Sequence, residues 1–582
     1  MAIEDRFDRL CRDTQVLQNA LDRSVKLPKT ESGFNATLPR VVNGALIGYN
    51  ETGDGLATRA GTSIAGDTQI TATGSTTPRW LSDRAADVVN AKDHATLQAA
   101  INAAPVGGCV LVPFGTYAIT EDITINKALT LLGAGKRQSI ISRTAAGANT
   151  AAIKITASHV RIEKIGVVGP SSADYTDDEN GIEAHGVSGG HLDDVAVVDC
   201  EVYNFGSGAI LFEYVDGLQA TNNDLHDCGY AGVRLESCTD GVVSKNRIHT
   251  MTPGSDGNAY GAYASQRTDA DAHCERIVFA GNVVRDIPLW EALDTHGGTD
   301  ISFTGNVIVG CKIGIVATAS VDPTFTHQAK RVSIVGNTIY KGSAPTPGAG
   351  IIATGVSAAQ RAESITIKGN VVDGMGGTGS TGAGAVIVQY INGLSLGGVI
   401  RDSVAIGLNI YDAVTDFVVS GLTIDGIQSG YASACGMMVG VGATACRGHI
   451  GDVVIDATAE YGIYFYSEQR GITWGKIKKI TSNPIPVVGG NYAGEGFEFS
   501  TEATFNFSAI ASGAYDWQEI TVVGAELGDY AQVSTSIDLA KLNLSAYVQA
   551  ANKVHFVLYN NTGGNVDLGP GDFTAKVTKV AR

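Results

Sequence analysis

Two carboxyl side chains, those of Glu236 and Asp294, lie in segments that strand alternation turns to the same outer face. In the segment GVRLE the two apolar side chains point inward, so Arg234 and Glu236 point outward. The segment WEALDTH aligns with it through the Thr-Asp pair that follows each segment, which exposes Asp294 and His296. Glycoside hydrolysis requires one protonated carboxyl group for the leaving oxygen and one carboxylate that activates water or attacks the anomeric carbon. Glu236 and Asp294 are therefore predicted to be a catalytic pair.

The distance between these two carboxyl groups follows from strand spacing. If the segments belong to a stack of parallel strands, Glu236 and Asp294 lie two strands apart, about 9–10 Å at the backbone. This distance suits inverting hydrolysis, which needs about 6.5–9.5 Å between the carboxyl groups. A slip of one residue in the alignment would turn Asp294 inward. Glu291, three residues before Asp294, is a third candidate catalyst.

Aromatic and polar side chains of the same stretch could hold a sugar chain. Arg, His and Tyr donate hydrogen bonds to sugar hydroxyls or to a uronate carboxylate, and aromatic rings stack on sugar rings. In the segment GAILF, the same alignment turns Ile210 and Phe212 outward. Insertions at 170–181 and 251–273 could wall a groove. The predicted substrate-binding residues are Arg234, His296, Tyr263, Glu183, His185, Trp290, Phe212 and Tyr230.

Elimination at a uronate is the second chemistry that the sequence allows. A base would remove the proton next to the carboxyl group, and a cation or Arg would neutralise that carboxyl group. His226, His249 and Arg285 occupy equivalent positions in successive repeats and could serve as a basic row, although stacked turn residues are the simpler interpretation of the two histidines. Exposed charges are often only solvated, but their clustering on one stretch favours a site.

Short repeated strands must position these side chains. One motif places an asparagine before a short strand, and the shortest steps are 246 − 223 = 23 and 306 − 282 = 24 residues. A second motif, a glycine followed by alternating apolar residues, gives each repeat at least one further strand. A coil of about 23 residues cannot bury its own face, so coils stack at about 4.8 Å and share one core. The asparagines predicted to align at turns are Asn223, Asn246, Asn282, Asn306, Asn337 and Asn370.

The two ends of the chain differ from this repeat. Residues 1–25 carry a short heptad seam that needs partner helices, as a parallel trimer would supply. A short helix with Leu97, Ala100 and Ile101 on one face precedes the strand CVLVPFG and would cap the first coil. Aromatic residues near the C-terminus could bind sugar, pack in a core or form a trimer interface, and they are Tyr515, Trp517, Tyr530, Tyr547 and Tyr559.

Composition narrows the classes of partner. The net charge of −18 would repel phosphate backbones, so we expect no nucleic-acid partner. The nine cysteines are scattered singly, which indicates buried thiols and maturation in a reducing cytoplasm. No apolar run is long enough for membrane insertion. The acidic segment DYTDDENG lacks the spacing of an EF-hand loop, and we expect no metal and no cofactor.

The repeats identify a resemblance. The segment from about 88 to 482 resembles the pectate-lyase-like right-handed parallel β-helix of phage tailspikes and of polysaccharide lyases and hydrolases. Residues 503–582 are similar to a small all-β C-terminal module of phage tail proteins. Glu291 resembles one of the clustered acidic residues of phage endoglycosidase tailspikes. This resemblance implies a homotrimer in the virion tail, assembled in the host cytoplasm and joined to a tail or baseplate protein through its N-terminal region.

The predicted fold is all-β, a right-handed parallel β-helix with a short N-terminal coiled-coil and anchor region and a C-terminal β-sandwich-like domain. The predicted function is recognition and hydrolytic depolymerisation of a bacterial capsule, exopolysaccharide or O-antigen. A polysaccharide lyase and a non-catalytic receptor-binding adhesin are the alternatives. The predicted domains are a trimeric helix at 1–25, a virion-anchoring head and neck at 26–88, the β-helix at 89–482, and a C-terminal trimerisation or carbohydrate-binding domain at 483–582.

Overall fold

The computed structural model describes residues 87–580 with short gaps and, within residues 1–86, only four short strands. The chain divides into two compact units, residues 1–86 and 87–582. The predicted trimeric helix at 1–25 lies outside the described residues. The gaps after residue 87 are 146, 148–149, 171–178, 254–256, 269, 322–325, 344–347, 378–382, 429–433, 443, 457–460, 467–470, 476, 482–484, 489–497, 523 and 579.

The first unit contains two antiparallel strand pairs among its described residues. They are β1 (Ala45–Tyr49) with β2 (Leu56–Ala60), and β3 (Gln69–Ile70) with β4 (Arg79–Trp80). No helix in the described part of the chain is long and apolar enough to cross a membrane.

The second unit begins with a capped end of the coil stack. After η1 (Ala91–Asp93), the helix α3 (Leu97–Ala103) starts at Thr96, whose side-chain oxygen accepts a hydrogen bond from the backbone N–H of Ala99. The buried face of α3 consists of Leu97, Ala100 and Ile101, as predicted. This helix packs on β6 (Gly108–Val112) and β8 (Ile123–Ile125), so it covers the core of the first coil.

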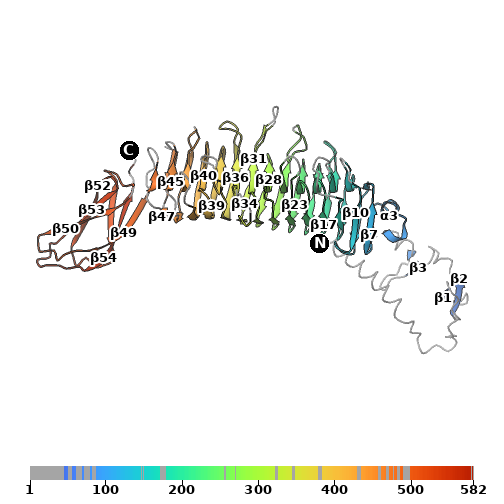
Figure 1. The fold of residues 1–582 in the computed structure, drawn as a ribbon, viewed down its shortest axis with the longest axis horizontal. Coiled ribbons are helices and arrows are strands. Elements are labelled where there is room, and N and C mark those ends of the chain that lie inside the picture. The colour runs from blue at the N-terminus through green and yellow to red at the C-terminus, as the bar shows by residue number, and fades with distance from the viewer. Residues whose placement is uncertain are drawn as a thin grey trace. The chain divides into compact units, whose positions relative to one another are not determined.

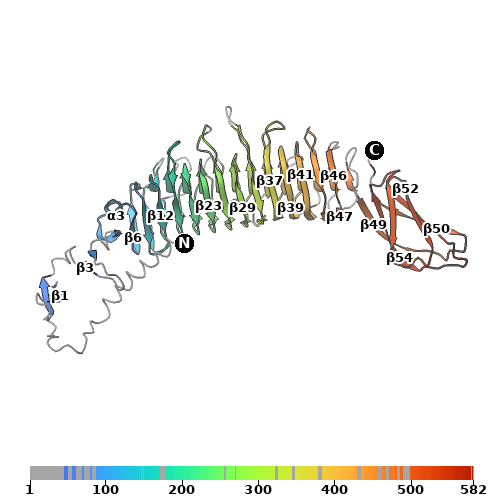
Figure 2. The same cartoon turned by 180° about the vertical axis from the view of Figure 1, so that it is seen from behind.

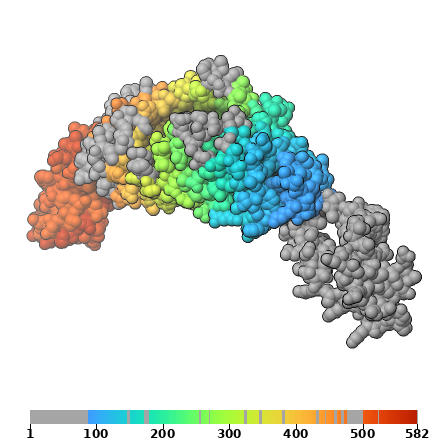
Figure 3. Space-filling model, turned by 45° about the vertical axis from the view of Figure 1, so that its right-hand side comes forward, coloured from blue at the N-terminus to red at the C-terminus, as the bar shows by residue number. Residues whose placement is uncertain are grey.

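Parallel coils follow one another from the capping helix to residue 488 and form a right-handed β-helix (Figures 1 and 2). One face is a sheet of fourteen described strands in which each coil adds one strand. In Figure 3 the coils succeed one another in order along the β-helix, from blue to orange. The strands of this sheet are β8, β11 (Ala151–Ile155), β14 (Asn180–His185), β18 (Gly208–Glu213), β22 (Ala231–Glu236), β25 (Tyr260–Ser265), β28 (Glu291–His296), β31 (Ile313–Thr318), β36 (Ile351–Thr354), β38 (Val386–Gln389), β40 (Ile406–Ile410), β42 (Cys435–Val439), β45 (Tyr461–Phe465) and β48 (Ile485–Val488).

The other strands form a second sheet of 28 described strands, to which most coils contribute two or more strands and three coils contribute one long strand each. In β37 (Ala362–Asp373), one long strand pairs with two strands of the coil before it. A separate hairpin joins β32 (Ser320–Val321) to β33 (Thr326–His327). The remaining strands are β5 (Val88–Asn90), β6, β7 (Gly115–Ile119), β9 (Leu129–Gly133), β10 (Ser139–Arg143), β12 (Val160–Glu163), β13 (Gly166–Val168), β15 (Leu192–Asp193), β16 (Val195–Val198), β17 (Glu201–Tyr203), β19 (Val215–Asp216), β20 (Gln219–Thr221), β21 (Asp224–His226), β23 (Thr239–Ser244), β24 (Arg247–His249), β26 (Glu275–Ala280), β27 (Val283–Arg285), β29 (Ser302–Thr304), β30 (Val307–Val309), β34 (Ser333–Val335), β35 (Thr338–Tyr340), β39 (Ile391–Ser403), β41 (Thr415–Ile427), β43 (Arg447–Ile450), β44 (Val453–Asp456), β46 (Gly471–Trp474) and β47 (Ile477–Thr481).

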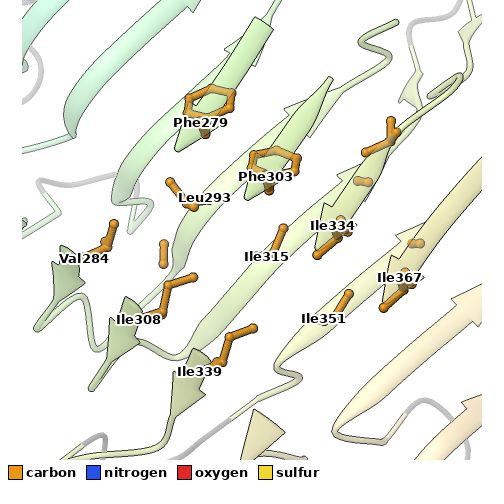
Figure 4. Packing of buried hydrophobic residues seen from close by; sticks show 14 of the residues in the cluster. Phe279, Val284, Leu293, Phe303, Ile308, Ile315, Ile334, Ile339, Ile351 and Ile367 are labelled. Carbon is orange, nitrogen blue, oxygen red and sulfur yellow. The ribbon is translucent and has the colours of Figure 1, made fainter. Parts of the chain in front are cut away.

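The core of the β-helix consists of rows of apolar side chains that stack from coil to coil. Parallel register places each inward residue directly over its equivalent in the next coil, and all of these side chains are buried. Rows from both sheets face one another inside the coil (Figure 4). The eight cysteines in the described residues are also buried as free thiols, which confirms the prediction for them. The rows in Figure 4 are Phe279, Phe303, Ile334 and Ile367; Val284, Ile308 and Ile339; and Leu293, Ile315 and Ile351.

An asparagine ladder closes the turns between two strands of each coil, as predicted. Asn282 donates a side-chain hydrogen bond to Asn306 Oδ1 at 3.0 Å, and Asn306 donates one to Asn337 Oδ1 at 2.9 Å. Each backbone N–H also bonds the next asparagine, as between Asn282 and Asn306 at 2.9 Å. These buried amides are therefore satisfied by one another and fix the alignment of successive coils.

The C-terminal module is a sandwich of two antiparallel three-stranded sheets, which confirms the predicted β-sandwich. Phenylalanine side chains, including the fully buried Phe556 and Phe573, pack between the sheets. One sheet has the order β49 (Glu498–Asn506), β54 (Pro570–Thr578), β51 (Tyr530–Thr535), and the other β50 (Tyr515–Thr521), β53 (Lys553–Tyr559), β52 (Asn543–Ala550).

Candidate active site

The outward face of strands β14 to β28 carries the predicted site. Arg234 lies opposite Tyr263, and Tyr263 lies opposite Asp294, on three consecutive strands. Leu293 is fully buried in the core, so its neighbour Asp294 faces outward. The predicted alignment of GVRLE with WEALDTH is therefore confirmed at these positions.

The orientation predicted for Phe212 is wrong. Phe212 is fully buried and lies opposite Ala184 and Leu235, in a row of core residues. The outward residue is Glu213, which lies opposite His185 on one side and Glu236 on the other. The segment GAILFE offers no apolar-polar contrast before its last residue, which allowed a slip of one position. Glu213 is thus a site residue that the sequence alignment missed.

The exposure predicted for the catalytic pair is also wrong, because neighbouring side chains cover both carboxyl groups. Glu236 is only 4% exposed and Asp294 only 1% exposed. Tyr260 and Tyr263 of β25 lie between them, in an aromatic cluster that also contains the half-buried rings of Tyr230 and Trp290. Tyr230 and Trp290 are both predicted sugar-binding residues.

Glu236 is held by a network of buried donors. Its Oε1 accepts hydrogen bonds from Arg234 Nη2 at 2.9 Å and from the Tyr263 hydroxyl at 2.6 Å. Arg234 also donates to Ser207 Oγ at 2.8 Å and to the Tyr263 hydroxyl oxygen at 3.1 Å. The second oxygen, Oε2, is buried without a hydrogen-bond partner and lies 3.6 Å from Arg267 Nε. One oxygen is thus fixed while the other has capacity to accept a proton.

A second carboxyl group, that of Glu213, lies one strand from Glu236. It pairs with Arg267 Nε at 2.6 Å and contacts His185 Nδ1. Burial raises the pKa of Glu213, while Arg267 opposes this shift. Glu183 lies on the same face, 3.6 Å from His185 Nδ1. The predicted residues Glu183 and His185 are thus placed beside the catalytic candidates.

Glu291, Asp294 and His296 form a third group on β28. Residues 291 and 294 would face opposite ways in a regular strand, but Ala292 and Leu293 both point into the core, so the alternation is reset. The carboxyl oxygens of Glu291 and Asp294 and a ring nitrogen of His296 lie within 4.8 Å of one another. Asp294 Oδ2 is 3.1 Å from His296 Nε2.

Both acidic members of this group favour the protonated form. Burial, followed by the proximity of Asp294, raises the pKa of Glu291 to about 9. Burial also raises the pKa of Asp294 well above its usual value. One oxygen of each carboxyl group is buried without a hydrogen-bond partner. The pair can therefore hold a proton at neutral pH, which is the state required of a general acid.

Two groups among the described residues have the atoms and spacing to hold a metal ion. They are Glu183, His185 and Glu213, and Glu291, Asp294 and His296. In the first group Arg267 already neutralises Glu213. The prediction of no metal stays a prediction.

The catalytic candidates are two strands apart, as predicted, but offset along the strands. Glu236 lies opposite Ser265, whereas Asp294 lies opposite Tyr263, which is two residues earlier. This offset lengthens the expected backbone distance to about 12 Å. The hydrogen bond to Tyr263 nevertheless draws the Glu236 carboxyl group back toward the level of Asp294. Strand β25, which carries Tyr263, thus lies between the strands of the two functional groups.

The basic row lies on the other sheet and is a stack of residues at the ends of strands β21, β24 and β27. His226, His249 and Arg285 are in register, as predicted. The two imidazole rings stack with centroids 4.9 Å apart, and Tyr203 stacks on His226 at 4.8 Å. His249 Nε2 is 3.4 Å from the buried Asp224. This arrangement matches the simpler interpretation of the histidines.

The raised pKa of Glu291 predicts a pH-dependent stability. The folded chain retains a proton that the unfolded chain releases above about pH 4.5, so the contribution of Glu291 falls as pH rises toward 9. Replacing it by Gln should stabilise the protein by an amount near zero at about pH 4 that grows to roughly 1–3 kcal/mol near pH 9. Urea unfolding at several pH values would measure the difference.

A matched control is Asp240→Asn. Asp240 is exposed, and its hydrogen bond with Arg276 lowers its pKa, so no gain that grows with pH is expected. A Glu291→Gln difference that stays constant with pH would contradict the protonated state of Glu291.

Comparisons with known proteins support the fold. Residues 130–390 match the family model for a right handed beta helix region. No curated protein matches the chain in sequence. A variant of the tailspike protein of E. coli bacteriophage HK620, solved in complex with a pentasaccharide, aligns over 88% of this chain and 98% of its own, with 14% identity and a TM-score of 0.53. This match confirms the predicted resemblance at the level of the fold.

Two further solved structures are more distant. The tailspike protein gp49 from Pseudomonas phage LKA1 covers 84% of this chain and 92% of its own, with 13% identity and a TM-score of 0.49. The catalytic unit of a GH87 alpha-1,3-glucanase from Streptomyces thermodiastaticus covers 69% of each chain, with 16% identity and a TM-score of 0.43.

Proposed function

We propose that this protein is a phage tailspike that binds a bacterial surface polysaccharide and cleaves it by glycosidic hydrolysis. The observation that carries the proposal is the arrangement of carboxyl groups on one outward face. A protonated pair, Glu291 and Asp294, lies on β28, and Glu236 lies two strands away on β22, bonded to Tyr263 of the strand between them. The HK620 tailspike, which shares the fold and was solved with a pentasaccharide, supports the same class of ligand.

In the proposed reaction, the pair on β28 supplies the proton. A carboxyl group with a raised pKa protonates the glycosidic oxygen as the bond to the anomeric carbon breaks. Glu236 acts as the base that takes a proton from the attacking water. Its Oε1 is fixed by Arg234 and Tyr263, and its buried Oε2, which has no hydrogen-bond partner, is the proton acceptor. Inverting hydrolysis needs about 6.5–9.5 Å between the two carboxyl groups, which leaves room for that water.

The surrounding side chains fit substrate binding. The half-buried rings of Tyr230 and Trp290 can stack on sugar rings. Arg267, His185 and His296 retain exposed surface and can donate hydrogen bonds to hydroxyl groups. In a homotrimer attached to the phage tail through its N-terminal region, three such sites would hold a repetitive polymer by avidity.

Product analysis tests the proposed function. The purified chain is incubated with capsular polysaccharides and lipopolysaccharides from candidate hosts, while reducing ends and the ultraviolet absorbance of unsaturated uronates are followed. New reducing ends without that absorbance are expected, since hydrolysis forms no double bond. Absorbance would establish a lyase instead, and binding without any cleavage would establish an adhesin.

A further inference from the structure

The outer face of one C-terminal sheet carries exposed aromatic rings. Tyr515 is 66% exposed, Trp517 and Tyr547 are each 50% exposed, and Tyr559 is 42% exposed. All of them lie on the sheet β50–β53–β52, at alternate positions that point away from the sandwich core. The aromatic face is defined here as Tyr515, Trp517, Tyr547, His555 and Tyr559.

We infer that the aromatic face is a second polysaccharide-binding site, separate from the carboxyl groups of the β-helix. The inference rests on the proposed function in one respect, since it takes a polysaccharide as the ligand. The aromatic rings would stack on sugar rings, and hydroxyl and amide groups around them would bond sugar hydroxyls.

The rings are held in place before any ligand binds. His555 is 92% buried because its ring lies between two exposed rings. The centroid of Trp517 is 4.7 Å from that of His555, and the centroid of Tyr547 is 5.2 Å from it. Trp517 and Tyr547 stand on the two strands that flank β53, offset by two residues, which places their backbones about 12 Å apart by strand spacing. This spacing presents two rings to two different sugar residues of one chain.

The chemistry of the aromatic face differs from that of the inward face of the same sheet. The inward side of the same strands is aliphatic and aromatic, with Val554, Phe556 and Leu558 fully buried. The outward side places tyrosine, tryptophan and histidine beside Asn543, Ser545 and the Glu519–Lys553 ion pair of 2.6 Å. Flat rings among hydrogen-bonding groups, with the charge of Glu519 neutralised, suit a hydroxyl-rich polymer.

Binding to immobilised glycans tests the inference. The full-length Asp294→Asn chain, which keeps the probes intact, is passed over capsular polysaccharides and lipopolysaccharides from a panel of Gram-negative bacteria. Adding Trp517→Ala should weaken binding about tenfold, and Trp517→Ala with Tyr547→Ala more strongly. Tyr530→Ala is the matched control, because Tyr530 is 72% exposed but stands on the other sheet.

The outcomes separate this inference from the proposed function. Unchanged binding by the Trp517→Ala chain would overturn the inference alone. Dissociation of the oligomer by Trp517→Ala would also overturn it, because the aromatic face would then be an interface between copies of the chain. If binding depends on Trp517 but the wild-type chain cleaves no glycan, the inference is supported and the proposed hydrolase is overturned. A parent chain that binds none of the probes would overturn both.

Discussion

Asp294→Asn and Glu236→Gln are each expected to lower kcat on the polysaccharide by about 10³-fold. Asn cannot supply the proton that the leaving oxygen needs, and Gln cannot accept one from water. Both replacements keep the size of the side chain, so the aromatic cluster around them should persist. Reducing-end release under saturating substrate would measure kcat, and binding to immobilised polysaccharide would show that recognition survives.

The control for this experiment is Asp300→Asn. Asp300 lies in the connection between β28 and β29, paired with Arg331 at 2.6 Å, and its replacement should leave kcat unchanged. Because the two catalytic groups act in one step, the double variant should lose little more activity than either single variant. Full activity in both single variants would remove these residues from the mechanism.

Glu213→Gln separates two mechanisms on the same face. Glu213 and Glu236 lie directly opposite each other on neighbouring strands, a spacing close to the roughly 5 Å of retaining enzymes. If Glu213→Gln is as inactive as Glu236→Gln, and the product keeps the anomeric configuration of the substrate, the retaining pair replaces the inverting one. An inverted product with residual activity in Glu213→Gln would support the assignment of Asp294.

The repeat could be predicted because short sequence motifs recur from coil to coil. An asparagine recurs in successive coils from Asn223 to Asn370, and a Thr-Asp pair follows both GVRLE and WEALDTH. That pair aligns Arg234 with Asp294 without any knowledge of the fold. The ladder that the asparagines form is the physical reason for that recurrence. The same alignment failed at Phe212, because the residue types of an all-apolar strand do not show which side chains face the core and which face outward.

Burial of the site could not be predicted in the same way, since the covering groups come from other coils. Glu236 is covered by Tyr263 of the next strand and by Arg267, which follows that strand. The pKa of Glu291 depends on burial and on Asp294, which shares its side of β28 only because Ala292 and Leu293 both turn inward. Such a local irregularity has no signal in the pattern of residue types.

Replacing Arg234 by Met is expected to destabilise the protein by about 3–5 kcal/mol, since it removes the buried charged partner that lies closest to the Glu236 carboxylate. Urea unfolding followed by tryptophan fluorescence would measure the change. Arg276→Met is the matched control, because the pair of Arg276 with Asp240 is exposed to solvent and its loss should have little effect.

A double variant distinguishes the stability role of Arg234 from its role in the site. Replacing Arg234 by Met and Glu236 by Leu together removes both charges, so most of the lost stability should return while activity stays absent. If Arg234→Met costs no more stability than Arg276→Met, the Arg234–Glu236 pair behaves as an exposed pair and the expected effect of its burial is wrong. If stability returns in the double variant, the fold does not need the buried pair. The buried position of Arg234 and Glu236 would then be explained by the reaction and not by stability, as expected of a site that costs the protein stability to maintain.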